Sequence, residues 1–230
     1  MSYFNKHEKF FDFLIEEIKK NKMNYSNEFS DGRINSIKDE DTARDLIVKI
    51  YSKHPYGDYE IDTSVDRKWY DLAFINKNDK NDIIPINIKV SKLGTDNISG
   101  KEGIFYALTG KNPDNFNTSS WETFMDNIEK NLDIHLDASK DYYFLVFNKK
   151  VENDCYWTSL KCLTELTQNP NNLPFQSNWT LNRVRVKRSN IDAFKFLLSN
   201  LQGSHQKRVD ISKLVVDYCN EIINKAENDG

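Results

Sequence analysis

Three polar side chains interrupt two short apolar runs, and their types suit them to hold a metal ion or a phosphate. Asp71 lies in the first run, residues 69–75. Asn87 and Lys89 lie in the second run, residues 83–91. Burying an acid, an amide and an ammonium group is costly unless they face a metal, a phosphate or one another. These three residues are therefore the first candidates for chemistry.

The segments around these residues predict two adjacent antiparallel strands. Residues 76–82, which join the two runs, are all Asn, Asp or Lys, as expected for a solvent-exposed turn. Alternate side chains of a strand point to the same face, so Asn87 and Lys89 share one face. The isoleucines and the valine between them fill the other face. We expect Asp71 on the neighbouring strand, close to this pair.

This pattern resembles the PD-(D/E)XK nuclease superfamily, and in particular the type II restriction endonucleases. In that family an Asp near the end of one strand and an acid-x-Lys on the next strand build a magnesium site. Asp71 matches the first acid and Lys89 matches the lysine. Asn87 stands where the second acid is normally found, so one metal ligand becomes neutral. The resemblance covers residues 58–110.

The resemblance implies a mechanism and a set of DNA contacts. Magnesium would be held by Asp71, by the carbonyl oxygen of Asn87 and by the main-chain carbonyl of Ile88. Lys89 would orient the attacking water or stabilise the transition state, and hydrolysis would release a 5′-phosphate. The next segment looks like one that turns toward DNA in restriction enzymes, with these candidate contacts: Ser91, Lys92, Asn97 and Lys101.

Other acids in the sequence are candidates to compensate for the neutral Asn87. Glu60 and Asp62 share one face of an expected strand over residues 59–63, and either could add an oxygen ligand. The alternative for Glu60 is an ordinary acid on an edge strand. Glu40 lies near the first turn of an expected helix, and related nucleases sometimes bring such an acid to the metal. A solvated acid at a helix start is the alternative that we favour for Glu40.

A second basic stretch, residues 182–188, alternates in the manner of a strand. Arg183, Arg185 and Lys187 would point one way, and the two valines between them the other. One interpretation is an exposed edge strand that charge protects from aggregation. The other is a strand that contacts DNA phosphates or guanine edges. Three cations on one face of an acidic chain favour DNA contact.

Composition sets the outer bounds. A chain of 230 residues can bury one sizeable core, so we expect a single domain over residues 1–230. The net charge of −3 argues against DNA binding through overall positive charge, although a local basic surface is compatible with it. No apolar run approaches the roughly 20 residues of a membrane span, and no signal peptide is evident. We expect a cytoplasmic protein, and the abundance of Asn, Lys and Ile suggests a bacterial source.

Hydrophobic spacing predicts the remaining elements. Continuous apolar residues predict a central strand over 142–147, and residues 155–166 fit either a strand or a helix. A polar, basic loop is expected over 203–208. Amphipathic helices are expected over 4–20, 36–51, 121–132, 191–201 and 211–222. Three cysteines without CxxC spacing predict neither a disulfide framework nor a zinc site.

These patterns together predict an α/β domain with a central mixed sheet flanked by helices and a restriction-endonuclease-like core. The expected function is magnesium-dependent, sequence-specific cleavage of double-stranded DNA. A homodimer is expected, because two copies of one site related by a two-fold axis can cut both strands. One alternative is a repair or mobile-element nuclease that selects DNA structure. The other is a DNA-binding protein with a decayed site, and Asn87, whether native or an engineered change, is the reason to keep it.

Overall fold

The computed structural model describes residues 5–23, 25, 32–63, 68–98, 100–171 and 173–228. Side chains are described for all of these except 32–36 and 221–228.

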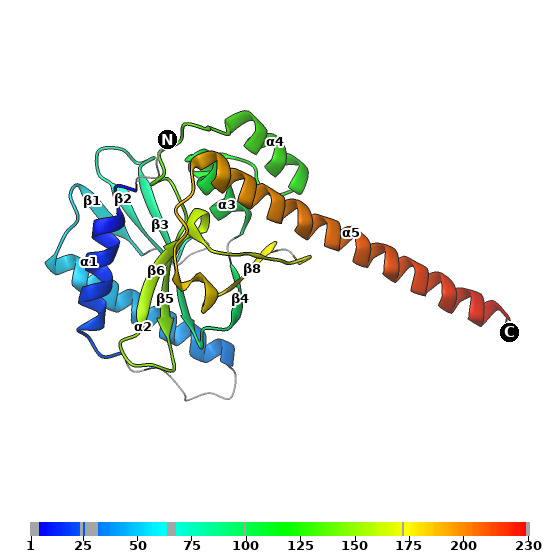
Figure 1. Cartoon of the computed structure of the whole chain (residues 1–230), viewed down its shortest axis with the longest axis horizontal. Helices are drawn as coiled ribbons and strands as arrows, with labels where there is room; N and C mark the ends of the chain where they lie inside the picture. The colour runs from blue at the N-terminus through cyan, green and yellow to red at the C-terminus, as the bar shows by residue number, and fades with distance from the viewer. Residues whose placement is uncertain are drawn as a thin grey trace.

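A five-stranded sheet forms the centre of the protein, in the order β1-β2-β3-β5-β6 (Figure 1). Strands β3 and β5 are parallel and the other neighbours antiparallel. The strands are β1 (Tyr59–Asp62), β2 (Leu72–Asn76), β3 (Ile83–Ser91), β5 (Tyr143–Asn148) and β6 (Cys155–Ser159). The predicted mixed sheet, its hairpin and its central strand are confirmed.

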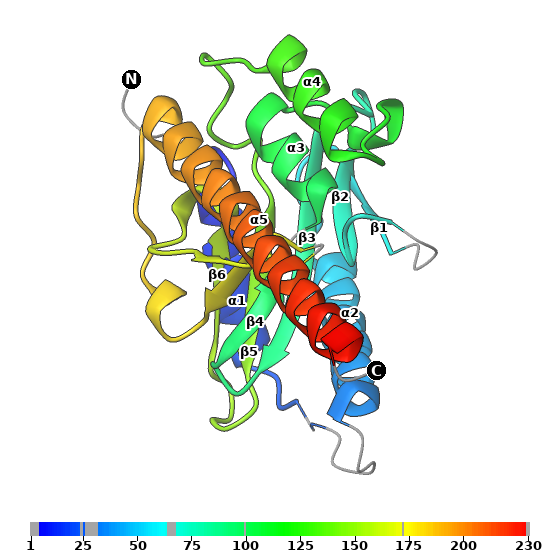
Figure 2. The ribbon, with the colours of Figure 1, turned by 90° about the vertical axis from the view of Figure 1, so that its right-hand side faces the viewer.

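Helices cover both faces of this sheet (Figure 2). Strand β5 is buried along its whole length because its alternate residues enter two different cores. Tyr143, Leu145 and Phe147 pack with the first core, and Phe144 and Val146 with the second. The first core contains α1 (Glu8–Lys19) and α2 (Gly32–Lys53). The second contains α3 (Lys101–Thr109), α4 (Trp121–Asn131) and the start of α5 (Asn190–Asn228). The predicted flanking by helices is therefore confirmed.

A second, three-stranded sheet follows β3 and was not predicted. Its order is β4 (Thr95–Ile98), β8 (Phe175–Asn178) and β7 (Thr167–Gln168), all antiparallel. These strands are short, and their residues are largely polar, so they carry almost no alternation signal. Short 3-10 turns occur at Pro113–Asn115, Leu160–Cys162 and Leu181–Arg183. The ambiguous segment 155–166 is thus strand β6 followed by a 3-10 turn.

The C-terminal prediction was wrong in one respect, because α5 is a single helix through the expected loop at 203–208. Gly203 in this stretch is no helix breaker but a point of close approach. A Cβ there would lie 2.1 Å from Nε2 of Gln168. Ser204 is buried, and its hydroxyl donates to the carbonyl of Pro174 at 2.5 Å. None of the helices in the described part of the chain is both long and apolar enough to cross a membrane.

The closed end of the β2–β3 hairpin is fixed by the carboxylate of Asp82. Tyr59 donates to it at 2.5 Å, Lys140 at 2.7 Å and Asn76 at 3.3 Å. Burial alone would raise the pKa of Asp82, but the bonds from Lys140 and Tyr59 hold it far below its usual value. This network ties β1, the hairpin and the start of β5 together, so the strand register is set from the end opposite Asp71.

His7 is a buried base next to this network. It is 1% exposed, and its ring lies edge-on to the rings of Tyr56, Tyr59 and Tyr143. Burial, with a smaller contribution from the Lys6 charge, lowers the pKa of His7 from 6.5 to about 4. The folded protein therefore keeps this ring neutral where the unfolded chain would protonate it.

This difference predicts that stability falls as the pH is lowered. The unfolded chain gains a proton on His7 below about pH 6.5 and the folded chain only near pH 4, so acid favours unfolding in that window. Between about pH 7 and about pH 5 the loss attributed to His7 is about 2 kcal/mol. Urea unfolding of His7→Gln should show a flatter dependence on pH than the wild type. His135→Gln, which alters an exposed histidine, should keep the wild-type slope; identical slopes for all three proteins would contradict this account.

Candidate functional site

Asp71 and Asn87 lie at the open end of the β2–β3 hairpin. The ladder ends with Leu72 against Ile86, so Asp71 comes just before β2 and Asn87 follows the last paired residue of β3. The amide of Asp71 donates to the carbonyl of Ile86 at 2.9 Å, one residue out of the ladder register. The amide of Ile88 donates to Oδ2 of the Asp71 carboxylate at 2.6 Å. These two bonds hold Asp71 against the part of β3 that contains Asn87.

Helix α2 brings a second acid to the same place. Arg44 on this helix donates from Nε to the main-chain carbonyl of Asp71 at 3.1 Å. Glu40 lies one turn earlier on the same face of the helix. The neighbouring Asp39 is buried and forms an ion pair with Lys149 just after β5, which fixes the helix against the sheet. Glu40 is therefore presented toward Asp71 from a fixed helix.

The pKa values show that Glu40, Asp71 and Lys89 act on one another. Burial raises the pKa of Glu40 to about 7, the charge of Lys89 opposes this rise, and the charge of Asp71 adds to it. The pKa of Asp71 is also raised by burial, against the hydrogen bond from Ile88 and the charge of Lys89. Glu40 and Asp71 are both removed from water, which raises both pKa values. The two carboxyl groups therefore share one low-dielectric site with the ammonium group of Lys89.

Tyr142 determines which way the Asn87 amide faces. Its hydroxyl donates to the carbonyl of Trp69 at 2.8 Å, and the Asn87 side chain lies beside this hydroxyl, where it opposes the rise that burial causes in the pKa of Tyr142. A hydroxyl has one hydrogen to donate, so toward Asn87 it can only accept. The nitrogen of the Asn87 amide therefore faces Tyr142, and its oxygen faces away. This oxygen, Oδ1, is buried and has no hydrogen-bond partner within the described residues.

Lys89 completes the group from the same face of β3 as Asn87. Within the described part of the chain its ammonium group makes no hydrogen bond and no close ion pair, although its charge acts on Glu40 and Asp71. An ammonium group without a direct partner beside two acids is available to an incoming anion. A phosphate oxygen or an attacking water suits it.

The donor set fits a hard divalent cation such as magnesium. Magnesium takes oxygen ligands and is held by one or two carboxylates, together with substrate phosphate and water. Glu40, Asp71 and the unpaired Oδ1 of Asn87 supply three side-chain oxygen donors. No cluster of three or more His, Cys, Asp or Glu residues that could hold a metal occurs in the described residues, so the third oxygen donor of this set is an amide.

Two other predicted ligands are placed differently. Glu60 lies on β1 opposite Ile75, about 13 Å along the sheet from the position of Asp71. Its side chain is exposed and forms an ion pair with Lys80 in the hairpin turn. The structure therefore does not bring Glu60 to the Asp71 carboxylate. The side chain of Ile88 is buried in the core below α1 and α2, so only its main chain faces the site.

The residues expected to contact DNA after β3 differ in how far their side chains are already buried or hydrogen-bonded within the chain. Ser91 is buried, and its hydroxyl accepts from the next turn. Asn97 on β4 accepts two hydrogen bonds from side chains of the second sheet and its loop. Lys101 donates to the carbonyls of Thr118 and Ser119 and lies 4.6 Å from the centre of the Trp121 ring. Lys92 is exposed directly after β3 and is the cation of this segment best placed to meet a partner.

The prediction of a basic strand over 182–188 was wrong. Its residues form a 3-10 turn and irregular backbone, and Val184 is exposed where a strand would bury it. The three cations are engaged by residues of other elements, and Arg185 and Lys187 share the carboxylate of Glu8. Arg183 forms a two-bond pair with Asp154, Arg185 stacks 3.7 Å from the ring of Trp157, and Lys187 contacts Glu8. These partners lie along α1 and β6, at the edge of the sheet beyond β5, and not beside Asp71.

Two members of the site were missed or discounted by the sequence analysis. Glu40 was named as a candidate but discounted, because its approach to Asp71 depends on how α2 packs against the hairpin through Arg44. Tyr142 carries no signal in the sequence, because its hydroxyl bonds join residues far apart in the chain. No protein-family model matches the chain, and no curated protein is similar enough in sequence to be matched.

The role of Tyr142 can be measured against its neighbour. Tyr142→Phe should free the Asn87 amide, shift its side-chain signal in a ¹H–¹⁵N spectrum and lower the free energy of unfolding by about 1–3 kcal/mol. Tyr143→Phe is the matched control, because that hydroxyl donates to Ser139 and accepts from Asn5 on the other face of the sheet. It should also cost stability but leave the Asn87 signal in place. An unmoved Asn87 signal in Tyr142→Phe would contradict the assignment.

Proposed function

We propose that this protein is a magnesium-dependent endonuclease that cuts double-stranded DNA at specific sequences, of the type II restriction class in the PD-(D/E)XK superfamily. One observation carries the proposal: Glu40, Asp71, Asn87 and Lys89 gather at one end of the β2–β3 hairpin, where their charges and burial act on one another. The mixed sheet with helices on both faces supports a restriction-endonuclease-like core.

The proposed chemistry assigns a task to each side chain. When bound, magnesium would offset the charge of the scissile phosphate and lower the pKa of a bound water. Asp71, Glu40 and the Asn87 oxygen would hold it. The Ile88 amide keeps the Asp71 carboxylate in place, since one of its two oxygens is already bonded. Lys89 would donate hydrogen bonds to the attacking water or to a phosphate oxygen and stabilise the negative charge that develops there.

The state of Asn87 favours an active enzyme over a protein with a decayed site. A buried carbonyl oxygen without a partner costs free energy, so it persists only where something else repays that cost. At Asn87 this cost arises from Tyr142. The Tyr142 hydroxyl can only accept from the Asn87 amide, so the amide nitrogen faces Tyr142 and the amide oxygen faces away. A bound metal ion would satisfy this oxygen, so the geometry supports metal binding through Asn87.

The acids can be tested by exchanging each carboxyl for its amide. Asp71→Asn and Glu40→Gln should each slow magnesium-dependent linearisation of supercoiled plasmid by more than about 100-fold, because each removes negative charge from the metal site. Lys89→Ala should fall in the same range. Glu60→Gln should cut like the wild type, because Glu60 pairs with Lys80 on the exposed edge. Circular dichroism would establish that all four variants are folded.

The distinction between Glu40 and Glu60 is the sharpest part of this comparison. Both are glutamates close to the hairpin in the sequence, and both receive the same substitution. Loss of cleavage in Glu60→Gln with retention in Glu40→Gln would show that the geometric assignment is wrong. Undiminished cleavage in Asp71→Asn would remove the whole site from consideration.

Asn87 can be tested by restoring the acid. Asn87→Asp adds a negative charge to the oxygen donors, so it should bind magnesium more tightly than the wild type if Asn87 contacts the metal. The comparison is made by calorimetric titration of magnesium into each protein bound to DNA. The matched control is Asn81→Asp, which adds the same charge to an exposed residue of the hairpin turn. Equal affinities for wild type and Asn87→Asp would exclude Asn87 from the metal ligands.

A further inference from the structure

A shallow cleft lies where the three-stranded sheet meets α5. Its volume is about 550 Å³, and residues of three elements line it. They are Asn97 from β4, Pro170, Asn171 and Leu173 from the segment between β7 and β8, and Arg208 from α5. Because the fold fixes these elements against one another, the polar groups of the cleft have defined positions.

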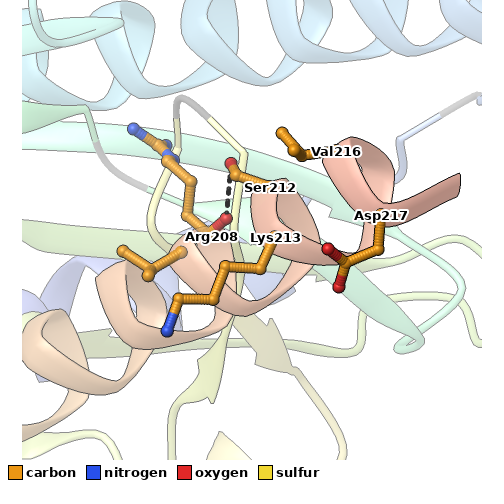
Figure 3. A pocket seen from close by; sticks show the side chains of 6 residues that line it. Arg208, Ser212, Lys213, Val216 and Asp217 are labelled. Carbon is orange, nitrogen blue, oxygen red and sulfur yellow. Dashed lines mark hydrogen bonds between the residues drawn. The ribbon is translucent and has the colours of Figure 1, made fainter. Parts of the chain in front are cut away.

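Arg208 reaches this cleft from the surface of α5. Figure 3 shows a second pocket, which residues of α5 alone line: Arg208, Val209, Ser212, Lys213, Val216 and Asp217. There the hydroxyl of Ser212 donates to the main-chain carbonyl of Arg208 at 2.8 Å, and the Arg208 side chain extends away from that of Lys213. On the side of the second sheet, Nε of Arg208 donates to the carbonyl of Pro170 at 2.7 Å, and Nη2 donates to the carbonyl of Asn171. The guanidinium group is therefore fixed at the cleft.

The neighbours of Asn97 determine which way its amide faces. The register of β4 and β8 places Asn97 opposite Gln176. Oδ1 of Asn97 accepts from Nε2 of Gln176 and from Nδ2 of Asn169, both at 3.0 Å. The main chain in turn orients Asn169, because its Nδ2 also donates to the carbonyl of Leu173 at 2.8 Å and its Oδ1 accepts from the amide of Asn171 at 3.3 Å. The oxygen of Asn97 is thus occupied, and its nitrogen is the free end of the amide.

Asn97 and Arg208 together offer hydrogen-bond donors and no free acceptor. Within the described part of the chain, neither Nδ2 of Asn97 nor Nη1 of Arg208 makes a hydrogen bond. A guanidinium group is planar, so the two bonds to the main chain also fix the direction of Nη1. The cleft therefore presents preorganised N–H groups to a partner that accepts.

Cations gather beside the cleft. Around the ring of Trp121, Nζ of Lys101 lies 4.6 Å and the Arg208 guanidinium 5.8 Å from the ring centre. The ring of His205 lies edge-on to the same indole at 4.3 Å. Burial lowers the pKa of His205, and the charges of Arg208 and Lys101 lower it further. The acid of β4, Asp96, lies on the opposite face of the strand, where an indole N–H donates to it. The local field thus favours an electron-rich group.

Among the groups of DNA, the major-groove edge of guanine fits this cleft best. Its O6 and N7 are both acceptors, whereas adenine places a donor beside its acceptor. The usual asparagine–adenine pair needs the oxygen of the amide, which Asn97 has already used. A phosphate is also an acceptor, but Pro170 and the 38% exposed Leu173 give the cleft apolar walls. Apolar walls suit the edges of neighbouring bases, such as a thymine methyl group, better than a hydrated phosphate.

The cleft lies within reach of a duplex bound at the candidate site. Asn97 follows Lys89 by eight residues, so the two are at most about 29 Å apart, which is less than one turn of duplex DNA, about 34 Å. Strand β4 leads into α3, and the charge of Glu102 on α3 adds to the rise in the pKa of Tyr142. The exposed Lys92 lies between Lys89 and Asn97 in the chain. One duplex can therefore contact both places.

We propose that Asn97, with Arg208 beside it, reads a guanine of the DNA target through the O6 and N7 atoms of its major-groove edge. The inference rests on the proposed function and adds one base to the recognition sequence. It also makes the three-stranded sheet the element that reads sequence, while the β2–β3 hairpin carries the chemistry.

The test selects duplexes that bind the wild-type protein from a random pool, with calcium in place of magnesium to keep bound DNA intact. The selected sequence should contain a guanine whose replacement by 7-deazaguanine weakens binding about 10-fold, because that base lacks the N7 acceptor. Asn97→Asp keeps the oxygen that Asn169 and Gln176 bind, but it replaces the N–H donors by an acceptor. At that one position it should select cytosine or adenine, whose major-groove edges donate. Asn81→Asp, which adds the same charge to the exposed hairpin turn, should still select guanine.

Three results would overturn the inference. Weaker binding of Asn97→Asp with an unchanged base preference would mark a phosphate contact. A selected sequence in which no guanine is affected by Asn97→Asp would remove base reading from this cleft. A pool from which the wild type enriches no sequence would also contradict the sequence specificity of the proposed function. The selection measures binding alone, so a chain that binds DNA but does not cut it would still give the guanine result, and the two failures are distinguishable.

Discussion

The hydrogen bond from the Ile88 amide to the Asp71 carboxylate is the contact on which the candidate site depends. It joins β2 to β3 at the point where the hairpin opens, and it consumes one oxygen of the carboxylate while leaving the other available. Burial makes this bond matter more, since an ionised carboxylate away from water requires such donors. A shift of the hairpin by one residue would move Asn87 and Lys89 to the other face of the sheet and remove Asp71 from both. The Asp82 network at the closed end prevents that shift.

Much of this arrangement could be predicted from the sequence because it is local. The polar turn and the alternation of isoleucines with Asn87 and Lys89 specify a hairpin and its faces, and Asp71 follows from the register. Glu40 and Tyr142 could not be assigned in the same way. Their positions depend on how α2 and the start of β5 pack against the hairpin, through Arg44 in one case and the Trp69 carbonyl in the other.

The errors also have physical causes. The alternation of cations over 182–188 looks like a strand, but ion pairs with acids on other elements produce the same pattern in irregular backbone. The polar stretch at 203–208 looks like a loop, yet Gly203 and Ser204 pack closely against Gln168 and Pro174, so the helix continues through it. In both places the decisive partners are distant in the sequence. The cations that were expected to contact DNA are largely engaged within the chain, so the account places the phosphate contact at Lys89 and the exposed Lys92.

The central claim is that Glu40, Asp71, Asn87 and Lys89, together with a divalent cation, hydrolyse DNA. The most direct measurement is digestion of phage DNA by the wild-type protein with magnesium and with a chelator, followed by sequencing of the fragment ends. The account predicts discrete fragments that appear only with magnesium, carry 5′-phosphates and begin at one common sequence. Intact DNA under all metal conditions would contradict the claim. Random or structure-dependent ends would contradict the proposed sequence specificity while leaving the nuclease chemistry.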